Sequence, residues 1–316
     1  MKRGEKEQNC LECAKKVVFY NNGTLRRDFD GKSYLDVSDE KFNKSYCSYF
    51  EFCNNAFGLS KEDKIEVANI LRKAKANEQA NNFPDFVFDN GFIEHFQFTS
   101  SKETKKGSWQ TIQEKDFERK AEKCETEFRE RCNNTPDFEN IRSVSTSMDI
   151  PEHSEEYLHE SFKRNFGNHI KSLENYNGNK KVGIFMVENF EFAVNMHEDI
   201  YNGLKENVSY GDLRQAQDFS CYRLSRDKVL LNYLYEYRDK IKYVIYVYND
   251  QERRNGATGM EAFYTYNVPK IEVIKLENIP YILQLLPWKF IVCPLNGGMV
   301  RTMQCISIKV NGSKNE

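Results

Sequence analysis

Apolar residues recur at helical spacing in several stretches of the chain. From Ser60, which can cap a helix together with Asp63, they return every three or four positions to about Asn77. The same spacing continues over 153–175, where an Asn-Gly pair follows. The pattern predicts helices at 60–77 and 153–175, shorter ones at 227–237 and 279–286, and an exposed, charged helix at 114–133.

Two continuous apolar runs, 181–188 and 241–248, are bounded by polar residues. Such runs are typical of strands that are buried on both faces of a sheet. Strands and helices alternate along this part of the chain, which favours a mixed or largely parallel sheet covered by helices. The sequence therefore predicts an α/β protein with a mixed central sheet flanked by helices.

Residues 83–99 have strand composition and contain the clearest hairpin signal, Asp89-Asn90-Gly91. A two-residue turn of type I′ needs positive φ at both central positions, and an Asn-Gly pair supplies them. We therefore predict a β-hairpin that turns at Asn90 and Gly91.

The predicted register places Asp85 opposite Phe96 and Val87 opposite Glu94, so that Asp85 and Glu94 share a face. As diagonal neighbours their Cβ atoms would lie about 7 to 8 Å apart. Two carboxylates at this separation can hold one divalent cation, and oxygen ligands favour Mg²⁺ or Mn²⁺. Such a cation polarises a phosphodiester and lowers the pKa of a bound water. In the alternative interpretation, Asp85 is a turn or cap residue and Glu94 is a solvated or paired carboxylate.

Pro84-Asp85, followed by a hairpin and then Glu94 after an apolar residue, resembles the core motif of the PD-(D/E)XK, or restriction-endonuclease-like, nucleases. The resemblance covers roughly residues 60–110. It implies an α/β/α core that cleaves DNA or RNA with the help of a bound metal, Asp85 and Glu94 being the ligands.

The resemblance also implies a further acid from the preceding helix, for which Glu66 or Glu78 is the candidate. One position departs from the family, because the second residue after the acid is normally a lysine that activates or orients water, and here it is Phe96. Lys102 or Lys106, just beyond the strand, would have to replace the missing lysine and contact the scissile phosphate.

Cys10 and Cys13 have the spacing of half a zinc site, and Cys47 with Cys53 would complete four thiolates around a structural Zn²⁺. Five residues separate the second pair, which is wider than usual, so reduced cysteines that pack in a core are the alternative. All four lie in a loop-rich start, residues 1–59, which we interpret as a small separate module.

The rest of the chain, 60–316, is predicted to form the nuclease-like α/β domain. A charged helical insertion interrupts it at about 110–150, and 134–153 is predicted to be a linker within that region.

Composition and charge indicate which partners and which cellular compartment the sequence favours. With a formal net charge of −2 over 316 residues there is no global basic field, so contact with nucleic acid would need a local patch. Nine cysteines without an apolar signal segment favour a reducing compartment, and we expect the cytoplasm. The longest apolar runs are shorter than a bilayer span, so no membrane-spanning helix is expected.

Walker loops, dinucleotide-binding glycine fingerprints and hydrolase nucleophile elbows are missing from the sequence. The favoured hypothesis is a Mg²⁺-dependent nuclease with nucleic acid as its partner. The rival is a non-catalytic nucleic-acid or protein binding module on the same fold, in which Phe96 marks a lost active site. A zinc-stabilised protein-interaction factor is the third hypothesis.

Overall fold

A six-stranded sheet forms the centre of the computed structural model. The described residues are 4–19, 26–27, 33–34, 59–78, 83–105, 107–133, 142–189, 194–201, 214–219, 222–255, 263–285, 289–294 and 298–305. The sheet consists of β3 (Lys75–Ala76), β4 (Phe86–Phe88), β5 (Gly91–Gln97), β9 (Val182–Asn189), β12 (Tyr243–Asn255) and β13 (Phe263–Lys275). Their spatial order is β13-β12-β9-β5-β4-β3. Because β9 is parallel to β5 and β12 while the other neighbours are antiparallel, the predicted mixed sheet is confirmed.

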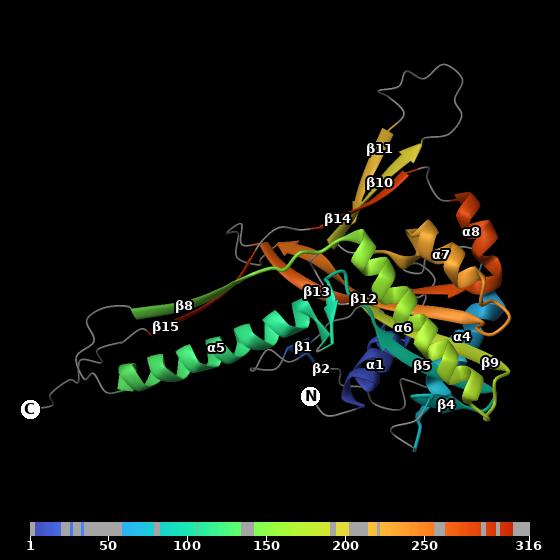
Figure 1. Ribbon diagram of the computed structural model, residues 1–316, viewed down its shortest axis with the longest axis horizontal. Helices are drawn as coiled ribbons and strands as arrows, with labels where there is room; N and C mark the ends of the chain where they lie inside the picture. Colours follow the sequence, from blue (N-terminus) through green and yellow to red (C-terminus); the bar gives the residue numbers. More distant parts are fainter. Residues whose placement is uncertain are drawn as a thin grey trace, which may run out of the picture.

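Helices cover both faces of this sheet (Figure 1). α1 (Glu5–Phe19) and α4 (Lys61–Lys73) pack on one face, and α6 (Glu155–Asn175), α7 (Lys228–Tyr235) and α8 (Ile279–Leu285) pack on the other. All of β9 is buried, and its successive residues Ile184 and Phe185 enter the cores of opposite faces. The helices predicted at 153–175, 227–237 and 279–286 and the strand at 181–188 are confirmed to within two residues at each end.

The start of the chain is helical, whereas the sequence predicted loops there. α1 contributes Cys10, Leu11, Ala14, Val17 and Val18 to the core that it shares with α4 and the sheet. These positions follow helical spacing. Because cysteine and alanine are weak apolar signals, the spacing was not recognised as a helix in the sequence. Residues 5–19 thus belong to the core of the α/β fold.

α4 begins as predicted and ends earlier than predicted. Ser60 and Asp63 form a capping box in which each side chain accepts a hydrogen bond from the backbone of the other. The helix ends at Lys73 rather than at about Asn77, because the chain turns there into the edge strand β3.

The insertion extends away from the sheet as an arm (Figure 1). It contains α5 (Trp109–Asn133), the predicted charged helix, and β8 (Arg142–Asp149). The prediction of a linker at 134–153 is wrong, because β8 pairs over eight residues with β15 (Gly298–Cys305). Ser and Thr dominate β8 and give little apolar alternation, so its strand character depends on a partner far along the chain.

The other strands form small sheets. β10 (Val194–Tyr201) lies between β11 (Arg214–Phe219) and β14 (Lys289–Pro294). The remaining short elements are β1 (Arg26–Arg27) paired with β2 (Ser33–Tyr34), β6 (Glu103–Thr104) paired with β7 (Gly107–Ser108), and the 3₁₀ turns η1 (Leu224–Arg226) and η2 (Leu276–Asn278). In the described part of the chain, no helix has the length and apolar character that crossing a bilayer requires.

Candidate functional site

The hairpin of β4 and β5 turns one step earlier than predicted. Phe88 pairs with Gly91, so Asp89 and Asn90 are the turn residues, and the register differs from the predicted one by two residues. Side chains alternate with a period of two, so a shift of two leaves every residue on its predicted face. Continued by one pair, the observed register places Asp85 directly opposite Glu94 rather than diagonal to it.

Gly91 is required at this turn because of its neighbour on β9. A Cβ atom on Gly91 would lie 1.9 Å from the carbonyl oxygen of Val182, whose own N–H donates to the carbonyl of Asn90. The residue therefore permits a close backbone approach.

The carboxylates of Asp85 and Glu94 form a reciprocal clamp across the two strands. The backbone N–H of Asp85 donates to Glu94 Oε2 at 2.9 Å, and the backbone N–H of His95 donates to Asp85 Oδ2 at 2.8 Å. On the facing helix α6, His169 places Nδ1 2.6 Å from Glu94 Oε1. The sequence predicted that Asp85 and Glu94 lie close together. The structure adds a third side chain, His169, which lies 75 residues after Glu94 in the chain.

Burial and the negative charge of Glu94 raise the pKa of Asp85 from 3.8 to about 6. Glu94 is buried and Asp85 is half-buried, so water shields their mutual repulsion only partly. The site thus favours an added positive charge, either a proton on Asp85 or a cation between the two groups.

Phe96 fills the position of the lysine that the resemblance implies, and it is part of the aromatic core. Its ring stacks on that of His169 at a centroid distance of 5.2 Å, and it makes edge contacts with Phe162, Phe166 and Phe185. An ammonium group at this buried position would be desolvated. The place next to the carboxylates is taken by the imidazole of His169 instead.

The acids and lysines that were expected to assist the pair lie elsewhere. Glu66 is on α4, across the sheet, where it pairs with Lys242 Nζ at 2.6 Å and accepts from Tyr243 Oη at 2.7 Å. The expectation that Glu66 joins the metal ligands is therefore corrected. Glu78 is exposed, and the exposed Lys102 lies beyond the end of β5, where its carbonyl accepts a hydrogen bond from the N–H of Trp109. Lys106, Cys47 and Cys53 lie outside the described residues.

A second polar cluster lies on the opposite face of β5, to which strand alternation directs His95 and Gln97. His95 Nε2 is 2.7 Å from Glu188 Oε2 of β9, and Gln97 Nε2 donates to Glu188 Oε1 at 3.0 Å. The thiol of Cys10 on α1 also hydrogen-bonds Glu188, and burial is the main cause that raises the pKa of this thiol. Sequence analysis did not identify this cluster, because its members come from different parts of the chain.

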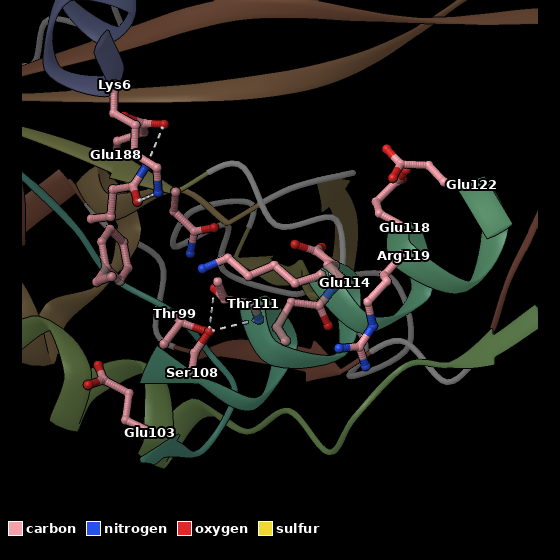
Figure 2. Close-up of a pocket in the computed structure, with 15 residues that line it drawn as sticks. Lys6, Thr99, Glu103, Ser108, Thr111, Glu114, Glu118, Arg119, Glu122 and Glu188 are labelled. Atoms are coloured by element: carbon pink, nitrogen blue, oxygen red, sulfur yellow. Dashed lines mark hydrogen bonds between the residues drawn. The ribbon is translucent and has the colours of Figure 1, made fainter. Parts of the chain in front are cut away.

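A cavity of about 680 Å³ opens beside this cluster, at the carboxyl ends of the parallel strands β5 and β9. Ligands of α/β proteins commonly bind at such ends. Figure 2 shows Lys6 and Glu188 at one end of the cavity and Glu118 and Glu122 of α5 at the other. Carboxylates outnumber basic groups in the lining, so the cavity favours cations.

A serine–histidine pair at the base of the insertion is structural. Ser100 Oγ lies 2.7 Å from His153 Nδ1, and Gln110 Oε1 lies 3.3 Å from the other ring nitrogen. Burial lowers the pKa of His153 to about 4, so the ring stays neutral at pH 7. Both residues are buried, and their contacts hold the two ends of the insertion together.

Comparison of the chain with protein-family models, with curated proteins and with solved structures gives no match.

Proposed function

We propose that this protein is a Mg²⁺- or Mn²⁺-dependent nuclease of the restriction-endonuclease type, in which Asp85 and Glu94 hold the metal. The observation that carries the proposal is the direct opposition of these two carboxylates on the hairpin. A mixed sheet between two helix layers is also the architecture that the sequence resemblance implies.

The donor set fits a hard divalent cation. Each carboxylate oxygen carries two lone pairs, so the backbone and His169 hydrogen bonds leave both groups with coordinating capacity. The backbone hydrogen bonds fix the carboxylates in place before any ligand arrives, which reduces the reorganisation needed for binding. A metal bound there would supply Lewis-acid activation of the phosphate and of water.

His169 is the side chain that we assign to the role of the missing lysine. Nδ1 is held by Glu94, and Phe96 fixes the plane of the ring by stacking on it. The imidazole is partly exposed, with 27% of its side-chain surface accessible. Its other nitrogen, Nε2, can accept a proton or a hydrogen bond from the attacking water.

Cleavage assays with the full chain test this proposal. Single- and double-stranded DNA and RNA are incubated with Mg²⁺ or Mn²⁺, and with EDTA as the metal-free reference. Asp85→Ala and Glu94→Ala are expected to lower cleavage to the EDTA level, because each removes a metal ligand. His169→Ala is expected to lower kcat by about 10²-fold with little change in metal affinity.

Two exposed carboxylates provide matched controls. Asp89→Ala changes an acid in the same hairpin turn, and Glu78→Ala changes the acid that the resemblance offered as an alternative ligand. Both variants should cleave like the wild type. Cleavage that persists in Asp85→Ala and Glu94→Ala would refute the assignment of the site.

A non-catalytic binding module on the same fold is the second candidate. Two observations favour it: each carboxylate already accepts a backbone hydrogen bond from the opposite strand, and Phe96 replaces the lysine. This candidate predicts no metal-dependent cleavage by the wild type and unchanged nucleic-acid or protein binding by Asp85→Ala. The same preparations therefore decide between the two functions.

A further inference from the structure

The cluster on the α1 face of β5 joins a thiol, an imidazole and a carboxylate from three separate elements. Cys10 comes from α1, His95 from β5 and Glu188 from β9. Sγ of Cys10, a ring nitrogen of His95 and a carboxylate oxygen of Glu188 all lie within 4.8 Å of one another. The three residues are 0%, 7% and 5% exposed. Titratable groups are costly to bury, and a cation bound by all three would offset that cost.

We propose that Cys10, His95 and Glu188 form a Zn²⁺ site at the end of the cavity. Thiolate, imidazole and carboxylate are the three ligand types that zinc accepts, whereas Mg²⁺ and Ca²⁺ prefer oxygen alone. Three protein ligands leave a fourth tetrahedral position, which is the pattern of zinc sites that bind water or substrate. This site is separate from Asp85 and Glu94, which occupy the other face of the sheet.

The groups around the cluster orient its ligands. Gln97 donates to Glu188 Oε1, and Lys6 Nζ donates to Gln97 Oε1 at 2.9 Å. These contacts hold the carboxylate so that its other oxygen, Oε2, faces His95. Outer contacts of this kind fix ligand orientation in metal sites and contribute to affinity.

The cavity supplies an entry path. Glu188, Gln97 and Lys6 belong both to the cavity wall and to the cluster or its supporting contacts. The excess of carboxylates along the cavity concentrates cations near its wall. A zinc ion held by the cluster would therefore lie next to a space in which water or a small ligand fits.

The ligand set differs from the four-thiolate site that the cysteine spacing predicts. Both sets include Cys10, but only the proposed site needs His95 and Glu188, and only the four-thiolate site needs Cys13 and Cys47. Variants at these positions separate the two sites directly.

Metal binding by the full, metal-stripped chain tests the inference. Titration calorimetry with Zn²⁺ should give one site per chain. Cys10→Ser, His95→Gln and Glu188→Gln should each weaken binding by more than the roughly 10- to 100-fold loss expected for Gln97→Leu, which removes only an orienting contact. Cys124→Ser, at a half-buried thiol on α5, is the matched control and should bind like the wild type.

Co²⁺ absorption of the wild type gives a second readout that does not depend on the folding of any variant. One thiolate ligand should produce a single-thiolate charge-transfer intensity. A four-thiolate intensity, or zinc binding that survives His95→Gln and Glu188→Gln but is lost in Cys13→Ser and Cys47→Ser, would overturn the proposal. Absence of stoichiometric binding to the folded wild type would overturn it as well.

Discussion

Replacing Asp85 with asparagine is expected to raise the free energy of unfolding at pH 7.5 by about 2 kcal/mol. The carboxyl group has a pKa of about 6 in the folded protein, against 3.8 for the ordinary group, because it is buried beside Glu94. A shift of this size corresponds to about 3 kcal/mol, and partial exposure of the side chain reduces it. Asparagine keeps an oxygen that can accept the His95 N–H and removes the charge.

The sign of the effect depends on pH. A folded pKa above the unfolded one means that the protonated form is favoured by folding, so the stabilisation is fully present below about pH 4. It is lost as the pH rises through 6. Chemical unfolding should therefore show little difference between Asp85→Asn and the wild type at pH 4, and the advantage of the variant should grow from about pH 4 to 6 and level off by pH 7.5.

Added Mg²⁺ should reverse this order. At a concentration of 100 times its Kd, a ligand of the folded state stabilises by about 2.7 kcal/mol. Only the wild type, with both carboxylates, should gain this stability. Asp89→Asn is the control, since its carboxylate in the same turn is exposed and its replacement should leave stability nearly unchanged. A loss of stability in Asp85→Asn at pH 7.5 would show that the clamp needs the charge.

The sequence predicted that Asp85 and Glu94 share a face of the hairpin, but it did not predict which residues lie directly opposite each other. Strand alternation placed Asp85 and Glu94 on one face, and the two-residue shift in register preserved that assignment. The turn was misplaced because Asn-Gly is the usual signal for a positive-φ turn. At Gly91 the glycine is required by the carbonyl of Val182 instead.

The sequence could not predict which side chains contact the candidate site residues, because these contacts depend on tertiary packing. His169 meets Glu94 across 75 residues, and Glu188 meets His95 across 93. No local pattern encodes such contacts. Glu66 shows the opposite error: a resemblance placed it near the metal, while on the far side of the sheet it pairs with Lys242 and accepts a hydrogen bond from Tyr243. Local periodicity thus located the later helices and the central strands but missed α1 and β8, and only the packed fold identifies which side chains meet.

Gly91→Ala is expected to destabilise the protein by about 2 to 3 kcal/mol, the upper part of the range for overpacking. The new Cβ would lie 1.9 Å from the backbone oxygen of Val182 and 3.0 Å from the side chain of Phe88. Backbone cannot move aside as a flexible side chain can, so β5 and β9 must separate at the point where their parallel pairing begins. Unfolding in denaturant should show a lower midpoint with an unchanged slope.

Gly167→Ala, on α6, is the matched substitution with the opposite expected sign. Its new Cβ would make only an ordinary contact, 3.8 Å from Tyr233 Oη, and alanine is favoured over glycine within a helix by about 0.5 to 1 kcal/mol. The pair isolates the effect of the close approach, because both variants add one methyl group. If Gly91→Ala were as stable as Gly167→Ala, the contact between β5 and β9 at Val182 would not fix the hairpin that carries Glu94 and His95. Destabilisation confined to Gly91→Ala, together with weaker Mg²⁺ and Zn²⁺ binding, would show that one backbone contact positions the ligands on both faces of β5.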